Sequence, residues 1–127
     1  MKIAICYTTW GNRGIIGDSI NHLLKSLTNV SPEYDFEIFT VELQGVAGAK
    51  NKCLELAYES GADHIFLFDD DCYPIREDWW KPYVESKEPH LMFQFRLPNK
   101  PKSDMQELYR DDDIVAYSHT RGAMIYI

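Results

Sequence analysis

The sequence predicts an α/β fold in which a mostly parallel sheet is flanked by helices, and three observations support this prediction. Short apolar runs of strand length alternate with segments of helical periodicity through the first half of the chain. The connections between them are short, and each apolar run ends in turn-forming or polar residues. A strand-helix-strand-helix-strand order of this kind favours parallel strands joined by covering helices.

The first strand and helix come from the N-terminal 30 residues. Residues 2–8 are an apolar run that opens into a polar, glycine-containing loop, so we expect a buried strand there. A helix is expected to start at Asp18 or Ser19, either of which can act as the N-cap, and to end before Pro32. Its spacing predicts an inner face of Ile20, Leu23, Leu24 and Leu27.

A second strand is expected at residues 36–41, a second helix at 46–60 and a third strand at 64–68. Gly61 stands where a helix end favours a left-handed residue. The expected inner face of this helix is Val46, Ala49, Cys53, Leu56 and Ala57.

The second half of the chain is less regular. Asp78 is expected to cap a short helix that runs to Val84, with Pro82 tolerated only near its start. Further strands are predicted at 90–96, 114–118 and 122–127, and most of residues 97–113 is interpreted as a loop.

Composition limits the classes of function. The length of 127 residues and 45% hydrophobic content predict one domain over residues 1–127. A net charge of −7 argues against general nucleic-acid binding. Three cysteines without a CxxC pair predict a reducing, cytoplasmic setting, and no apolar run is long enough to cross a membrane.

The chemically informative segment is the apolar third strand, which runs directly into the acidic triplet Asp69, Asp70 and Asp71. Ligands of open α/β sheets bind beyond the carboxyl ends of the strands. Carboxylate oxygens suit Mn²⁺ or Mg²⁺, and strand alternation makes Asp69 and Asp71 the natural pair. A solvated acidic turn is the simpler alternative; a magnesium-dependent phosphatase is disfavoured because its second acidic motif and lysine have no clear place.

Three segments in order carry a family resemblance. Residues 4–13 resemble an opening strand that ends in a Thr-Tyr-Asn-Arg type loop, residues 48–54 resemble an Ala-Arg-Asn-x-Gly helix start, and Asp69 and Asp71 match an Asp-x-Asp motif followed by Pro74. Residues 122–125 also resemble a later Gly-Ala strand. The chain therefore resembles the GT-A glycosyltransferases, especially family 2, over nearly its whole length.

The resemblance implies a site. Thr8, Arg13 and Glu42 would border the nucleotide base, although the family usually has aspartate where Glu42 stands. Lys50 replaces the family's arginine near a helix start, where a cation and free N–H groups attract phosphate. The residues implied in nucleotide-sugar binding are Thr8, Thr9, Arg13, Glu42, Lys50, Asn51, Asp69 and Asp70.

The same resemblance implies a divalent metal, Mn²⁺ or Mg²⁺, held by Asp69 and Asp71, with His119 as a candidate third ligand or acceptor contact. Cys72 is interpreted as a packing residue because hard metals prefer oxygen. Trp79 and Trp80 are candidates for a sugar-stacking platform, but core packing is preferred for one of them and left open for the other.

The implied reaction moves a sugar from a nucleotide-sugar, with a UDP-sugar favoured, to an unknown acceptor hydroxyl. The family's general base lies beyond the Gly-Ala strand, where this sequence stops, so the chain is expected to be truncated or minimal unless Asp111, Asp112 or Asp113 supplies the base. A nucleotide-sugar or metal-binding domain without full catalytic equipment is the alternative. A nucleotidyltransferase is disfavoured because the first strand lacks a Gly-rich triphosphate loop, and self-association stays open.

Overall fold

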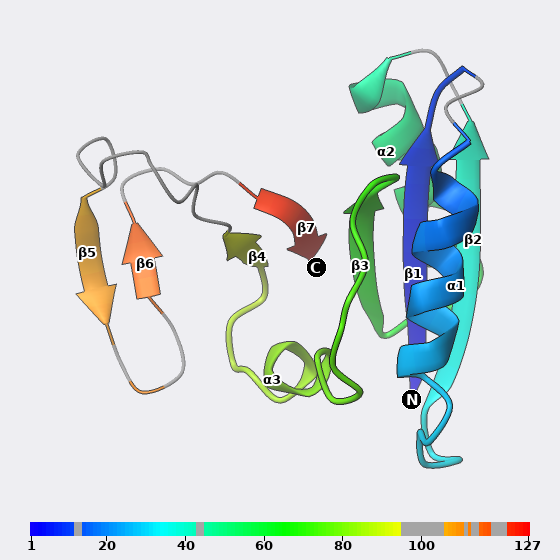
Figure 1. Cartoon of the computed structure of the whole chain (residues 1–127). Coiled ribbons are helices and arrows are strands. Elements are labelled where there is room, and N and C mark those ends of the chain that lie inside the picture. Colours follow the sequence, from blue (N-terminus) through cyan, green and yellow to red (C-terminus); the bar gives the residue numbers. More distant parts are fainter. Residues whose placement is uncertain (12–13, 43–44, 95–105, 111, 113–114, 118–121) are drawn as a thin grey trace.

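The computed structural model describes residues 1–11, 14–42, 45–94, 106–110, 112, 115–117 and 122–127. Figure 1 shows a sheet with helices packed on it and a separate small hairpin. The elements are β1 (Lys2–Thr9), α1 (Ile16–Ser26), β2 (Asp35–Glu42), α2 (Val46–Glu59), β3 (His64–Asp69), α3 (Lys81–Val84), β4 (Leu91–Gln94), β5 (Glu107–Arg110), β6 (Val115–Tyr117) and β7 (Gly122–Tyr126).

The main sheet has five strands in the order β2-β1-β3-β7-β4. Strand β1 pairs in parallel with β2 and β3, whereas β7 is antiparallel to both β3 and β4. Because β4 is antiparallel to β7, it runs in the direction of β3, so β7 alone opposes the other strands of this sheet. The α/β class and the mostly parallel sheet are confirmed.

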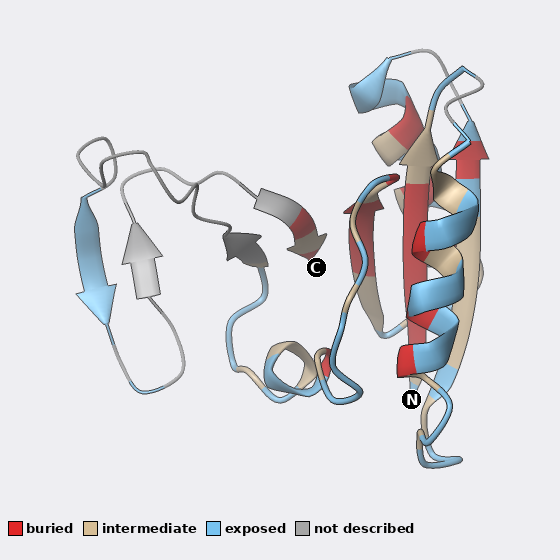
Figure 2. Cartoon of the chain, in the orientation of Figure 1, coloured by how far each residue is buried: buried red, intermediate tan, exposed pale blue. Residues whose placement is uncertain are grey.

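The two long helices cover opposite faces of the sheet (Figure 1). Alternation along β1 explains this: Ile3 and Ile5 belong to the core cluster that contains Leu23 of α1, and Ala4 and Cys6 belong to the cluster on the α2 side. Both clusters are fully or almost fully buried (Figure 2). The strand is therefore apolar on both faces, as its continuous hydrophobic run requires.

Both adjacent tryptophans pack in the core on the α1 side. Trp80 is 2% exposed and meets Tyr34 and Phe36 edge-on, with ring centroids 4.6 and 5.3 Å away. Trp79 is partly buried against Phe66, and its Nε1 donates a hydrogen bond to the Ser26 hydroxyl. The core packing preferred for one of the pair thus extends to the second.

The structure corrects the expected start of the first helix. Helix α1 begins at Ile16, so Asp18 and Ser19 lie inside its first turn and neither caps it. Ser19 is buried and its hydroxyl bonds to another segment, which takes this residue away from capping. Leu24 is 51% exposed because it lies one residue, or about 100° of helix rotation, past the buried Leu23.

Three other features differ from the sequence predictions. Val46 was expected on the inner face of α2, but it is 64% exposed at the first position of this helix, one turn before the buried Ala49. Helix α3 is a single turn from Lys81, and Asp78 pairs with Arg76 at 3.6 Å instead of capping it. The segment 97–113, predicted mostly as a loop, contains strand β5, which pairs with β6. The side chains of β5 are all exposed, so this strand has no apolar alternation that would have predicted it.

Gly61, with a φ of 77°, ends α2 in the left-handed region as expected. Strands β4, β6 and β7 fall inside the ranges predicted for them. Within the part of the chain that the structure describes, no helix has the length and apolar character needed to span a bilayer.

The loss of stability on replacing a tryptophan by alanine should depend on how deeply that tryptophan is buried. Trp80→Ala is expected to lower the free energy of unfolding by about 3–5 kcal/mol, because it deletes a buried ring. Trp10→Ala, the same substitution at a side chain that is 58% exposed, is expected to change it by less than about 0.5 kcal/mol. Urea unfolding followed by circular dichroism measures both, and equal losses would contradict this account of the core.

A partly buried histidine, His64, predicts how stability depends on pH. His64 Nδ1 lies 2.8 Å from the Tyr126 hydroxyl, and burial lowers the pKa of His64 from its usual 6.5, with Asp63 opposing this. The unfolded chain therefore takes up the proton first as the pH falls. This contribution to stability is complete above about pH 6.5 and is lost as the pH falls through the lower pKa of the folded state.

We expect the urea midpoint of the wild type to fall from about pH 7.5 to about pH 5.5, and His64→Gln to flatten this slope because glutamine does not titrate. His22→Gln, at an exposed histidine, is the matched control. Equal slopes in the wild type and His64→Gln would show that His64 does not carry the effect.

Candidate functional site

Three parallel strands deliver polar residues to one edge of the sheet. In the register of β1 with its neighbours, Thr8 is opposite Asp69 of β3, and Thr9 is opposite Glu42 of β2. These residues follow the buried positions of their strands, and Glu42 is exposed. Thr8, Thr9, Glu42 and Asp69, which were expected at one site, therefore lie at the same edge of the sheet.

Asp70 fixes the turn after β3. It is only 3% exposed, and its Oδ2 accepts a hydrogen bond of 2.9 Å from the Thr9 hydroxyl. Its backbone carbonyl accepts a bond of 2.7 Å from the Ser19 hydroxyl of α1. Asp70 thus joins β1, α1 and β3, and its carboxylate, which was expected to contact the donor, faces the protein interior.

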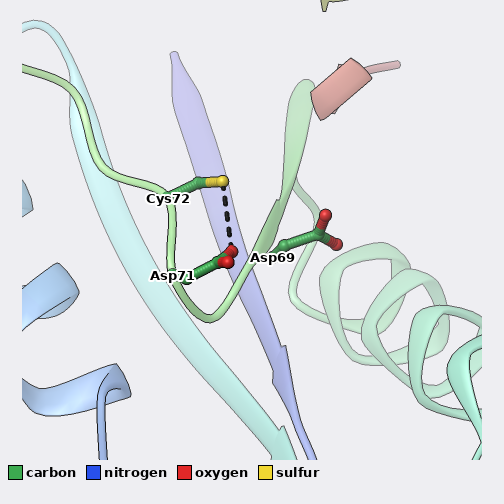
Figure 3. Close-up of side chains that lie close together, drawn as sticks. All are labelled: Asp69, Asp71 and Cys72. Carbon is green, nitrogen blue, oxygen red and sulfur yellow. Dashed lines mark hydrogen bonds between the residues drawn. The ribbon is translucent and has the colours of Figure 1, made fainter. Parts of the chain in front are cut away.

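Asp69, Asp71 and Cys72 form a second group, in which one potential ligand atom from each residue lies within 4.8 Å of the others. Figure 3 shows Asp69 at the end of β3, and Asp71 and Cys72 in the turn that follows. The Cys72 Sγ donates to Asp71 Oδ1 at 3.4 Å. Asp69 and Asp71 therefore lie close together, but the predicted orientation to the same side is wrong: β3 ends at Asp69, Asp71 lies in the turn, and Figure 3 shows the Asp69 carboxylate directed toward α2.

The thiol of Cys72 is held in its protonated form. Partial burial raises its pKa to about 12, and the hydrogen bond to Asp71 and the negative charges of the triplet act in the same direction. A hydrogen bond of 2.9 Å from the Tyr7 hydroxyl to the Cys72 carbonyl connects this turn to β1. The group therefore contains a protonated thiol beside the side chains of Asp69 and Asp71.

Lys50 joins this group from the opposite face. Its Nζ lies 3.2 Å from Asp69 Oδ1, and the two side chains are 22% and 47% exposed. Lys50 is the fifth residue of α2, which follows β2 and so begins at the carboxyl edge of the sheet. The expected cation near a helix start is therefore present, paired with Asp69.

The first turn of α2 is open to solvent (Figure 2). Gly45 precedes it with a φ of 97° and provides no side-chain cap, and residues 45–48 are all exposed. N–H groups at such a helix start are available to an anion. Asn51 is also exposed, but it follows Lys50 by one position and points about 100° away around the helix.

Five further residues were predicted for the site, and the structure describes one of them, Asp112. Arg13, His119, Asp111 and Asp113 lie outside the described residues. Asp112 is exposed in the connection between β5 and β6, a hairpin that Figure 1 shows beyond β4 and β7, away from β3.

Sequence reasoning missed Ser19, Tyr7 and Cys72 as parts of this site. Asp70 had no sequence signal for its inward orientation, because β3 ends at Asp69 and Asp70 lies in the turn that follows. Ser19 and Tyr7 had no such signal, because each bonds a backbone carbonyl from another element. Cys72 is adjacent to the acids in sequence, and its place beside Asp71 follows from the tight turn in which its N–H donates to the Asp69 carbonyl at 3.2 Å.

No protein-family model, curated protein or solved structure matches this chain. Its function is therefore argued from the chemistry of this edge.

Neighbouring acids of the triplet should differ in their effect on folding. Asp70→Ala is expected to lower the free energy of unfolding by about 1–3 kcal/mol, because the partly buried Thr9 hydroxyl loses its acceptor. Asp71→Ala, at an exposed carboxylate, should leave the stability unchanged or slightly raised. Urea unfolding of the two variants tests this, and a larger loss for Asp71→Ala would refute the division of roles.

Proposed function

We propose that this chain is a metal-dependent glycosyltransferase domain of the GT-A type that takes a nucleotide-sugar donor, with a UDP-sugar favoured. The observation that carries the proposal is the meeting of Asp69, Asp71 and Lys50 at the carboxyl edge of a mostly parallel sheet. The three sequence segments that resemble family 2 all lead to this edge: the end of β1, the start of α2 and the end of β3.

The donor atoms fit a divalent cation. Two carboxylates and a thiol can each offer an atom within 4.8 Å of the others, and hard oxygen ligands suit Mn²⁺ or Mg²⁺. Asp69 and Asp71 would hold the ion. When bound, it would neutralise the negative charge that develops on a departing diphosphate.

The diphosphate and the base of the donor would bind to residues on either side of the acids. Lys50 and the exposed first turn of α2 offer a cation and N–H groups to a diphosphate. Thr8, Thr9 and Glu42, at the ends of β1 and β2, would border the base. Asp70 would act indirectly, since its bond to Thr9 positions the turn that carries the other two acids.

In the transfer itself an acceptor oxygen would form a bond to the anomeric carbon, the bond from that carbon to the diphosphate would break, and the acceptor proton would pass to a base. Asp112, the base candidate within the described residues, lies on the hairpin away from Asp69. This placement favours a second candidate function, a domain that binds the donor without transferring the sugar.

Binding of the donor can be tested by thermal unfolding with UDP, GDP and their sugars, each with Mn²⁺ and with a chelator. We expect one base to raise the midpoint when Mn²⁺ is present, since a ligand at about 100-fold above its Kd adds about 2.7 kcal/mol of stability. Asp71→Ala should lose this shift while keeping its fold, and Glu59→Ala, which removes an exposed charge elsewhere on α2, should keep it.

Incubation of the wild type with the stabilising nucleotide-sugar separates the two candidate functions. Release of nucleoside diphosphate that stops with chelator favours the glycosyltransferase, and binding without release favours the binding domain. Full metal-dependent nucleotide binding by Asp71→Ala would overturn the assignment of the site.

A further inference from the structure

The ion pair between Lys50 and Asp69 couples the proposed phosphate contact to a proposed metal ligand. The 3.2 Å separation is between Lys50 Nζ and Asp69 Oδ1, an oxygen of the carboxylate that would also hold a divalent ion. Lys50 is the more buried partner, with 22% of its side chain exposed against 47% for Asp69. The pair therefore lies partly in the protein surface and not wholly in solvent.

The pairing of Lys50 with Asp69 is explained by the negative charge of the neighbouring carboxylates. The Asp71 carboxylate lies within 4.8 Å of an Asp69 ligand atom, and like charges at this separation repel. Within the described residues, Lys50 is the basic side chain that forms an ion pair with these acids. It thus offsets negative charge at Asp69.

We propose that Lys50 is an internal counter-ion that exchanges Asp69 for the diphosphate of the donor. In the protein without ligands it neutralises Asp69. When a divalent cation takes the Asp69 carboxylate, repulsion between the two cations favours departure of the ammonium group, which then lies free beside the open first turn of α2 to meet a phosphate. This inference rests on the proposed function and deepens it by assigning an order to the binding of metal and donor.

The exchange has two opposite consequences for affinity. Lys50 competes with the metal for Asp69, so it weakens the binding of the metal alone. It also contacts the diphosphate once released, so it strengthens the binding of the nucleotide. A lysine with only a structural role in α2 would not produce changes of opposite sign.

Lys50→Met tests the proposal because it removes the charge and keeps most of the side-chain stem. Calorimetric titration with Mn²⁺ alone should show affinity about two- to fivefold tighter than in the wild type, the range given by a partly exposed ion pair. Titration with UDP at saturating Mn²⁺ should show affinity about tenfold weaker, because a charge-assisted hydrogen bond is lost.

Two further variants provide controls. Lys52→Met removes a cation on the same helix that pairs with Glu55 at 3.1 Å, and it should leave both affinities unchanged. Lys50→Arg keeps the charge and should stay near the wild type in both titrations. Circular dichroism and the unfolding midpoint establish that each variant is folded.

The outcomes separate this inference from the proposed function. If Lys50→Met binds Mn²⁺ no more tightly than the wild type while Asp71→Ala does not bind it, the metal site stands and the exchange is refuted. Weaker binding of both Mn²⁺ and UDP by Lys50→Met would also refute it. If the wild type binds neither Mn²⁺ nor UDP with Mn²⁺, both proposals fall.

Discussion

The arrangement at the edge of the sheet depends on the burial of one carboxylate, that of Asp70. Strand β3 ends at Asp69, and Asp70 lies in the turn that follows with its carboxylate facing inward. A buried carboxylate is costly unless it accepts hydrogen bonds, and Thr9 provides one while Ser19 holds the carbonyl of the same residue. Because these bonds come from β1 and α1, the turn is fixed to both, and Asp69 and Asp71 are left near the surface.

Much of the fold could be predicted from the sequence because its strands are buried on both faces. Continuous apolar runs placed β1, β2 and β3 to within about two residues, and Gly61 marked the end of α2. The errors have a shared cause, which is that local patterns do not show tertiary partners. Ser19 has the chemistry of an N-cap, but it bonds to Asp70 and the helix starts earlier. Strand β5 is exposed and, among the described residues, pairs with β6, and its side chains show no apolar alternation that would have predicted it.

The site was predictable to the extent that topology determines it. The position of the acids at the carboxyl end of β3 follows from the apolar run before them, and a helix that joins parallel strands must begin at the same edge, which brings Lys50 close. The orientations of Asp69 and Asp71 do not follow from strand alternation, because β3 ends at Asp69 and Asp71 lies in the turn. The contact between Lys50 and Asp69 itself depends on the side-chain conformations of two separate elements. The anchoring bonds from Tyr7 and Ser19 join residues more than 50 positions apart, a separation that no sequence period reports.

The negative charge at this edge would oppose the binding of an anionic donor in the absence of a metal ion. Glu42, Asp69 and Asp71 all lie at the carboxyl ends of the strands or just after them, on a chain whose net charge is −7. Among the described residues, Lys50 is the cation paired with these acids, and one ammonium group does not balance three carboxylates. A diphosphate would add further negative charge to this edge, and the N–H groups of the first turn of α2 supply only a partial positive charge in return. A divalent cation would correct the imbalance and also release Lys50 from Asp69, so electrostatics gives a reason for metal dependence that is separate from any family resemblance.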